Sequence, residues 1–510
     1  MRPKIKHVTI LAVLMGMWLN AFLPGRADAQ PCEQWAAKIL SVQGMVQVRK
    51  VGETQWVPVQ LNEAYCAGDM VRVNKNSRAA PVLSNESLLR LDQNTTITIT
   101  GIEKEKTFII DLLKGAAHFF SRFPKRLKVV TPFVNAAVEG TEFYVRIEPQ
   151  QTYLSIFEGR VAATNETGSL MLDGGQSAIA RAGQAPVLRV VARPRDAVQW
   201  ALYYPPIINW QKEDFPGDES DWQGLVRSSI DFYWKGDVIR AFQALEKVPE
   251  NIRNPRFYMY RAALLLSVGR IEEAKSDIAS ALQLDASNSY AFALQSIIAV
   301  VQNKKENALK LATKAVELDA RSSTARVALS YAQQAYFDIH AALKSLEEAV
   351  KLDSVNGLAW ARLSELFLSV GYLDKAAESA RKAVVLNPNL ARTQTVLGFT
   401  YLGRIKIQEA KNAFEKAIGF DSADPLPRLG LGLAMIRGGD LKAGRAEIEI
   451  AVSLDPGNSL VRSYLGKAYY EEKRDGFAEN QYNIAKELDP LDPTPWFYDA
   501  IRKQTINRPV

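Results

Sequence analysis

Two patterns of hydrophobic and polar positions divide the chain. From about Lys38 to Ala192, short β-branched runs alternate in polarity between Gly, Asn and Asp, which predicts strands. From Pro255 onward, small and apolar residues recur every 34 residues, which predicts stacked pairs of helices. The predicted fold class is therefore multidomain α and β, with an N-terminal all-β domain followed by an all-α superhelical solenoid.

The β half has many short strands at close spacing. Such a pattern indicates a sandwich, a barrel or a short solenoid, and it does not choose among them. The strands are predicted at 39–48 (broken at Gly44), 88–91, 95–100, 108–112, 127–131, 144–147, 153–157 and 170–172.

The helical half contains seven units that fill residues 255–492 without an insertion. Small residues stand at the eighth, twentieth and twenty-seventh position of each unit, where paired helices touch, and this pattern resembles that of tetratricopeptide repeats. An Asp or Asn near the end of each unit fits a turn or cap. The eighth positions are Ala262, Ser296, Ser330, Ser364, Gly398, Gly432 and Gly466.

A second resemblance lies in the β half. The run Thr131–Phe143 resembles the signature strand of FecR-type domains, and Phe157–Val161 resembles that family's second landmark. Glu139 stands where the family usually carries Arg. The residues that carry the resemblance are read as structural, and they are Thr131, Pro132, Gly140, Thr141, Glu142, Phe143, Glu158, Gly159 and Arg160.

Gly140 and Gly159 are expected in tight turns or at close backbone approaches. Glu142 and Glu158 are expected to be solvated or to pair along a strand ladder, and not to act as catalytic carboxylates. The FecR resemblance implies a periplasmic sensing or docking domain. Transmembrane control of a sigma factor is not expected, because the sequence starts with an export signal and leaves no room for a cytoplasmic segment.

The export signal comprises a basic start, an apolar stretch from Val8 to Leu23, and the small-x-small site Ala27-Asp28-Ala29. The alternative is an uncleaved anchor helix, although the stretch is shorter than the roughly 20 residues that span a bilayer. We therefore expect a chain exported to the periplasm or cell envelope of a bacterium, without a transmembrane helix after cleavage.

The predicted domain boundaries follow from these patterns. They are 1–29 for the signal peptide, 30–192 for the FecR-like domain, 193–220 for a linker with a short helix, 221–254 for a degenerate helical repeat, 255–492 for the seven units and 493–510 for a partial repeat helix.

Cysteine and charge narrow the chemistry. Cys32 and Cys66 are the only cysteines, and an even pair in an exported chain predicts one disulfide, with two buried thiols as the alternative. Two cysteines and three scattered histidines cannot form a structural zinc site, and no cofactor is predicted. The net charge of +7 is spread thinly, and residues 201–510 are neutral, so nucleic-acid binding is not expected.

The linker carries aromatic residues and two prolines. Asp196 is predicted to cap a short helix that runs to Tyr204 and ends at Pro205-Pro206. The aromatic residues either pack the joint between the domains or form an exposed binding patch. They are Trp200, Tyr203, Tyr204 and Trp210.

The concave face of the repeats is predicted to form an apolar groove for an amphipathic helix or an extended segment. It lacks the Lys and Asn pattern of a carboxylate clamp. Alternatively, some of these side chains pack on the chain's own linker or on a missing C-terminal part. The groove residues are Tyr290, Ile297, Val301, Tyr331, Leu368, Phe399, Leu402, Leu433, Arg437, Lys467 and Tyr470.

The last helix has no partner helix within the sequence. It is expected to expose Trp496, Phe497 and Ile501, so either a partner covers them or the natural chain continues.

The predicted function is a non-enzymatic interaction scaffold of the cell envelope. The β domain would dock one protein and the groove would bind a segment of another. No catalytic triad, phosphate loop or nucleophile elbow is present in the sequence. The alternatives are a FecR-like signal-transducing sensor, which needs an uncleaved signal, and a scaffold for polysaccharide export in which Tyr331 and Tyr470 stack on sugars.

Overall fold

The structure is a computed structural model that describes residues 34–102, 107–121, 126–191, 193–218 and 221–506. The predicted signal peptide and Cys32 lie outside these residues. No cysteine of the described part is a free thiol, and the pairing of Cys66 with Cys32 stays a prediction.

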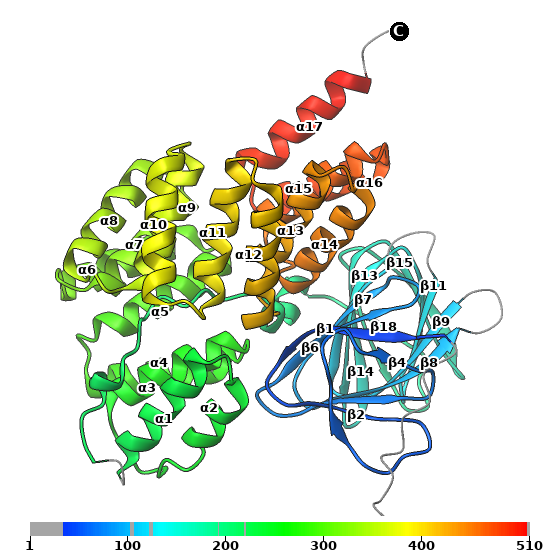
Figure 1. Cartoon of the computed structure of the whole chain (residues 1–510). Coiled ribbons are helices and arrows are strands. Elements are labelled where there is room, and N and C mark those ends of the chain that lie inside the picture. Colours follow the sequence, from blue (N-terminus) through cyan, green and yellow to red (C-terminus); the bar gives the residue numbers. More distant parts are fainter. Residues whose placement is uncertain (1–33, 103–106, 122–125, 192, 219–220, 507–510) are drawn as a thin grey trace, which may run out of the picture.

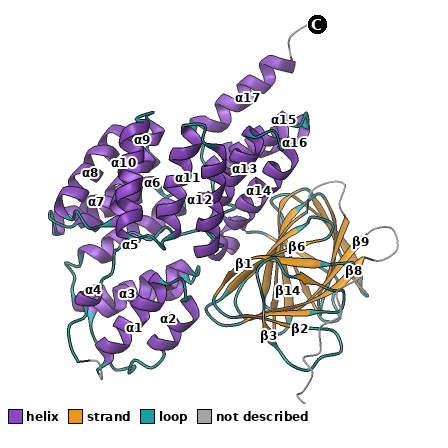
Figure 2. Cartoon of the chain, viewed as in Figure 1, coloured by secondary structure: helices purple, strands orange, loops and turns teal. Residues whose placement is uncertain are grey.

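The β half is a sandwich of two nine-stranded sheets (Figures 1 and 2), which settles the choice that the sequence left open. The first sheet has the order β18 (Val187–Arg189), β17 (Ser177–Arg181), β14 (Gln151–Glu158), β13 (Glu142–Glu148), β10 (Ala116–Phe120), β7 (Leu88–Leu91), β6 (Arg78–Leu83), β1 (Ala37–Gln43) and β4 (Ala64–Tyr65).

The second sheet has the order β16 (Gly168–Asp173), β15 (Arg160–Asn165), β12 (Asn135–Glu139), β11 (Arg126–Val130), β9 (Thr107–Lys114), β8 (Thr95–Ile102), β5 (Met70–Val73), β2 (Val46–Arg49) and β3 (Val57–Pro58). Strands β9 and β11 pair in parallel, and the other pairs are antiparallel. Apolar side chains of both sheets form one shared core.

The sequence suggested that the signature run Thr131–Phe143 is one strand, but the structure divides it between two. It forms β12 in the second sheet and the start of β13 in the first, and the chain crosses between sheets at Gly140, which has a φ of 65°. A left-handed conformation at this point is one that glycine adopts without steric cost.

The helical half begins with α1 (Trp222–Trp234) and α2 (Val238–Leu245), which form the degenerate repeat. Seven helix pairs follow, and a single helix, α17 (Pro493–Ile506), comes last. The pairs are α3 (Pro255–Ser267) with α4 (Ile271–Leu284), α5 (Ser289–Val301) with α6 (Lys305–Leu318), α7 (Ser323–Ala335) with α8 (Ile339–Leu352), α9 (Gly357–Ser369) with α10 (Leu373–Leu386), α11 (Ala391–Gly403) with α12 (Ile407–Phe420), α13 (Pro425–Arg437) with α14 (Leu441–Leu454) and α15 (Ser459–Glu471) with α16 (Asp475–Leu488).

The small residues of the repeat all lie at helix contacts, which confirms the stacking that their spacing predicted. Each residue at the eighth, twentieth and twenty-seventh position is buried. The recurring Asp or Asn is the C-cap of each second helix, and the cap residue at Asp285 is extended, with φ −143° and ψ 91°. This conformation stops the helix and turns the chain toward the next unit.

The superhelix curls far enough that distant units touch. Lys305, at the start of α6, forms an ion pair of 2.7 Å with Asp489, which follows α16. The side-chain amide of Asn303 also donates to the carbonyl of Leu488. The second and the seventh unit therefore meet at the rim of the concave face.

The linker differs from its predicted form. Its helix, η2 (Pro194–Ala201), is a 3₁₀ helix that ends before Tyr204, and its N-cap is Arg193 and not Asp196. A second short turn, η3 (Lys212–Asp214), follows. Trp200, Tyr204 and Trp210 are buried, so the aromatic residues pack the joint between the domains.

The last helix exposes Trp496, Phe497 and Ile501, as expected from the absence of a partner helix in the described part of the chain. No described helix has the length and apolar character needed to cross a membrane.

Candidate functional site

A buried ion pair joins the β domain to the repeats. Glu142 begins β13, and both oxygens of its carboxylate accept from Nη2 of Arg462 on α15, at 2.9 and 2.8 Å. Both side chains are 0% exposed. Nη1 of Arg195 and Nε2 of His118 each lie 3.3 Å from the same carboxylate. The expectation that Glu142 is solvated is wrong, because helices cover the outer face of the first sheet.

The electrostatics of this cluster follow from its burial. Burial alone would raise the pKa of Glu142, but Arg462, His118 and Arg195 together hold it well below its ordinary value. Burial lowers the pKa of His118, although Glu142 opposes the shift. The cluster is thus an ionised, buried carboxylate between two guanidinium groups, of which that of Arg462 is buried and that of Arg195 is partly exposed.

Further contacts extend the interface along the sheet. Leu40, Leu88 and Phe120 form an apolar cluster with Ile450 and Leu454 of α14. Arg428 of α13 donates to the carbonyl of Leu40 at 3.2 Å. The outer face of the first sheet is therefore occupied by the chain's own repeats.

Glu158 also faces the repeats. Its carboxylate accepts a hydrogen bond from the side-chain amide of Asn480 on α16. The sequence suggested that this side chain is solvated or pairs along a strand ladder. It is instead half-buried and contacts a helix of the repeats.

The other FecR-like residues have structural places. A Cβ on Gly159, which has a φ of +78°, would lie 2.7 Å from Cγ2 of the buried Thr141. The Thr131 hydroxyl donates to the carbonyl of Val134 at 2.6 Å. Phe143 stacks on Phe119 in the core, with ring centroids 4.8 Å apart. Pro132 is exposed, and Arg160 forms an exposed ion pair of 2.8 Å with Asp173.

The concave face of the repeats holds a cavity of about 990 Å³, which we call the groove cavity. First helices of successive units supply its apolar wall. Of the residues predicted for the groove, those that line it are Val301, Tyr331, Leu368, Phe399, Leu402, Leu433, Arg437 and Lys467.

Three predicted groove residues lie elsewhere. The ring of Tyr290 packs on Trp210 of the linker, with centroids 5.9 Å apart. Ile297 is 1% exposed within the core. The Tyr470 hydroxyl hydrogen-bonds Thr505 of α17 at 2.8 Å. The linker and the last helix therefore cover part of the surface that the repeat pattern would leave open.

Sequence reasoning missed a charged network in the wall of the groove cavity. The guanidinium of Arg362 lies 3.8 Å from the centroid of the Tyr331 ring. Arg392 pairs with Glu365 at 2.5 Å, and Arg362 pairs with the same carboxylate at 2.8 Å. A signal was present, because Arg362, Glu365 and Arg392 stand on first helices of adjacent units, but the repeat spacing does not show which of these charged side chains meet.

Arg437, at the end of α13, differs from the other cations of the cavity. Lys305 pairs with Asp489, and Lys467 pairs with Glu471. Within the described part of the chain Arg437 has no acidic partner, and its side chain is exposed. The groove cavity thus combines an apolar wall with a cation available to a ligand.

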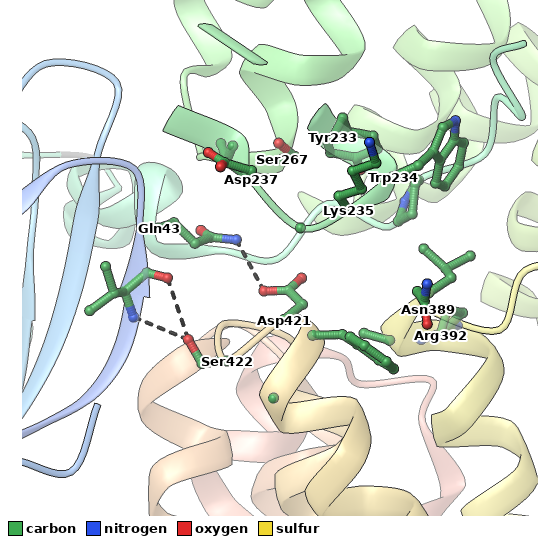
Figure 3. Close-up of a pocket in the computed structure, with 18 of the residues that line it drawn as sticks. Gln43, Tyr233, Trp234, Lys235, Asp237, Ser267, Asn389, Arg392, Asp421 and Ser422 are labelled. Atoms are coloured by element: carbon green, nitrogen blue, oxygen red, sulfur yellow. Dashed lines mark hydrogen bonds between the residues drawn. The ribbon is translucent and has the colours of Figure 1, made fainter. Parts of the chain in front are cut away.

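A second cavity of about 520 Å³ lies at the domain joint. Figure 3 shows Tyr233, Trp234 and Lys235 on one side, with Asp421 and Arg392 opposite. Its edge is fixed by hydrogen bonds from the β domain, since Gln43 donates to Asp421 at 3.3 Å and the amide of Val42 donates to the Ser422 hydroxyl at 3.1 Å. Tyr203 and Arg392 line both cavities.

Neither cavity contains the ligands of a metal site. Among the described residues, no group of three or more His, Cys, Asp or Glu side chains could hold a metal ion.

Asp424, the buried N-cap of α13, gives a testable pH dependence. It accepts from the Leu426 amide at 2.9 Å, and burial raises its pKa to about 7 although Arg392 opposes the shift. The pKa of an unfolded Asp is roughly 3.9, so between about pH 4 and 7 the folded state binds more protons. Stability from this group should therefore fall as pH rises, by at most about 1.4 kcal/mol per pH unit.

The substitution Asp424→Asn keeps an oxygen that can cap the helix and removes the titration. Its stability relative to wild type should rise between pH 5 and pH 7.5, as measured by urea unfolding at both pH values. Equal pH slopes for the two proteins would contradict the assignment.

The geometry defines a class of protein, namely a β sandwich docked on a helical-repeat array whose distant units touch. The model of the FecR protein family matches residues 69–162, and a tetratricopeptide repeat model matches residues 338–391. The β sandwich therefore contains a FecR domain and the helical array contains tetratricopeptide repeats, as the sequence predicted. A search of curated proteins found no match.

Several solved structures are similar in fold. The Cut9–Hcn1 hetero-tetramer of APC/C aligns at 16% identity with a TM-score of 0.46, over 62% of this chain and 64% of that chain. A thermophilic TPR protein of Thermus thermophilus aligns at 22% identity with a TM-score of 0.33, over 36% of this chain and 100% of that chain. A putative anti-sigma factor from Parabacteroides distasonis aligns at 16% identity with a TM-score of 0.24, over 27% of this chain and 67% of that chain.

Proposed function

We propose that this protein is an exported, non-enzymatic scaffold of the bacterial cell envelope whose groove cavity binds a segment of a partner protein. FecR and tetratricopeptide domains indicate an interaction or signalling scaffold. The export-signal pattern of the first 29 residues supports the location. The observation that carries the proposal is the groove cavity, with its apolar wall and the exposed Arg437.

In this proposal the β domain fixes the shape of the array. The Glu142–Arg462 pair and the apolar cluster around Leu40 and Ile450 dock the sheet on α13 to α16. The outer face of the first sheet is thereby used within the chain. A second partner would have to bind the second sheet or the edges of the sandwich.

Saccharide stacking at the two predicted tyrosines receives no support from the geometry. The guanidinium of Arg362 covers the Tyr331 ring, and Tyr470 bonds α17. A sugar that stacked on Tyr331 would have to displace a cation–π contact. A protein segment is the ligand that the cavity favours.

A photo-cross-linking amino acid at Leu402, inside the groove cavity, tests the proposal in cells. The matched control carries it at Val385, which is 80% exposed on α10 and outside the cavity. We expect a cross-linked partner from Leu402 only, and its loss when Leu433→Asp places a charge in the apolar wall. Equal cross-linking from both positions, or none from Leu402, would contradict the proposal.

A further inference from the structure

The chain already holds one extended segment against its own repeats. Residues 202–211, here called the strap, leave the 3₁₀ helix at Leu202 with φ −68° and ψ 154° and reach Gln211 with φ −117° and ψ 158°. Pro205 and Pro206 favour this extended form, since proline fixes its own φ and disfavours the helical region in the residue before it. Residues 203–211 of the strap form neither helix nor strand.

The repeats and the β domain hold the main chain of the strap and of Trp200, which lies two residues before it. Arg78 donates to the carbonyls of Trp200 and Leu202, at 2.9 and 3.1 Å. The amide of Tyr203 hydrogen-bonds the carboxylate of Asp455, the C-cap of α14. Nε1 of Trp234 donates to the carbonyl of Trp210 at 2.9 Å. Main-chain contacts of this kind hold an extended chain and not a helix, whose backbone groups are already paired.

The side chains of the strap fill the first units of the array. Ile207 and Ile208 are buried, and the Trp210 ring lies 5.7 Å from that of Tyr260 and 5.9 Å from that of Tyr290. The neighbouring wall includes Ala263, a groove position of the first unit. The strap therefore occupies the place that a ligand of these units would take.

The groove cavity continues from the strap. Tyr203 and Pro205 are among the residues that line the cavity, and its wall includes residues of α7, α9, α11, α13 and α15. The strap surface and the cavity are thus two parts of one concave face, the first filled by the chain itself. Arg437 lies in the unfilled part.

We infer that the ligand of the groove cavity is an extended, proline-containing segment of a partner protein, with aromatic or branched apolar side chains and an acidic side chain that pairs with Arg437. We expect this segment to lie on the same concave face as the strap and to be held, like the strap, through its main chain and its apolar side chains. A pre-extended proline segment loses little conformational entropy on binding, which suits a preformed cavity. This inference rests on the proposed function and chooses the extended ligand over the amphipathic helix.

The test uses two peptide libraries panned against the full-length protein. One contains proline every third residue among aromatic, branched and acidic positions, and the other contains proline-free amphipathic helices. Binding of the selected peptides is then measured by fluorescence anisotropy. We expect binders from the first library only, and a loss of about tenfold or more with Arg437→Gln, as for a charge-assisted hydrogen bond.

Two controls sharpen the result. Arg381→Gln, an exposed arginine on α10, should leave affinity unchanged. Replacing the acidic residue of the peptide with Gln should reproduce the loss and should make binding insensitive to Arg437→Gln. Binders from the helical library alone would overturn this inference and leave the proposed function standing. The absence of binders from both libraries, together with no cross-link from Leu402, would overturn both.

Discussion

Replacing Glu142 with alanine is expected to destabilise the protein by about 3–5 kcal/mol, because it leaves a buried guanidinium without its carboxylate. Arg462 and Glu142 are both 0% exposed, so bulk water does not solvate the guanidinium that loses its partner. The loss should appear as a lower midpoint of urea unfolding. It should also appear as faster proteolysis at the joint between residues 190 and 221, because the pair clamps the two domains together.

A matched control lies on the same strand. Glu148 pairs with Arg146 at the surface, and Glu148→Gln should cost at most about 1 kcal/mol. Combining Glu142→Gln with Arg462→Met removes both charges and should restore much of the stability lost in Glu142→Ala. If Glu142→Ala unfolds at the same urea concentration as Glu148→Gln, the pair does not hold the domains.

The pH dependence of this pair has the opposite sign to that of Asp424. The pKa of Glu142 is depressed in the folded state, so its contribution is present above the pKa of an unfolded Glu and is lost as pH falls through the folded value. Acidification should therefore narrow the difference between wild type and Glu142→Gln.

The repeat array could be predicted from the sequence because its information is local and periodic. Each small residue contacts a partner within its own unit or the next, so a 34-residue spacing specifies the packing. The burial of Ala274, Ala308 and Ala342 follows from that spacing alone. The two helices of the degenerate repeat were likewise visible from Gly236-Asp237, which stands at the turn between them.

The interface could not be predicted, because it depends on contacts between distant residues such as Glu142 and Arg462, which are 320 positions apart. If one face of the sheet is assumed to meet water, Glu142 is expected to lie on that solvent-facing side. A hint existed in β7 and β10, whose sequences LLRL and AAHFF do not alternate and are buried at every position. Strands buried on both faces read as continuous apolar runs, and these two were not recognised as evidence of a covered sheet.

The groove was predicted only in part, for a related reason. The repeat positions identify the concave face, but they do not report what lies on it. Ile297 stands at a groove position and is buried in the core. Tyr290 stands at another and packs on Trp210 of the strap, whose path depends on Arg78 and Asp455 from other parts of the fold. Whether Arg437 has an acidic partner likewise depends on which carboxylates the superhelix brings near it.

Replacing Gly432 with alanine is the second change with a large expected effect. A Cβ at this position in α13 would lie 2.5 Å from the carbonyl oxygen of Gly444 and 2.6 Å from Cγ1 of Ile448, both on α14. The first of these atoms is backbone and cannot move away without separating the helices. Such overpacking typically costs about 1–3 kcal/mol. It should lower the midpoint of urea unfolding and disturb the groove cavity, to which Leu429 and Leu433 of the same helix contribute.

Gly419 in α12 provides a control in which the same substitution should act in the opposite direction. A Cβ there meets no atom within 4 Å. Alanine is the better helix former, so Gly419→Ala should stabilise the protein by a few tenths to about 1 kcal/mol. Both variants gain the same methyl group, so the difference between their stabilities reports the cost of the contact between the helices, apart from the gain in helix propensity. If Gly432→Ala were as stable as Gly419→Ala, the two helices would not be packed backbone to backbone, and the groove that their stacking builds would lose its physical basis.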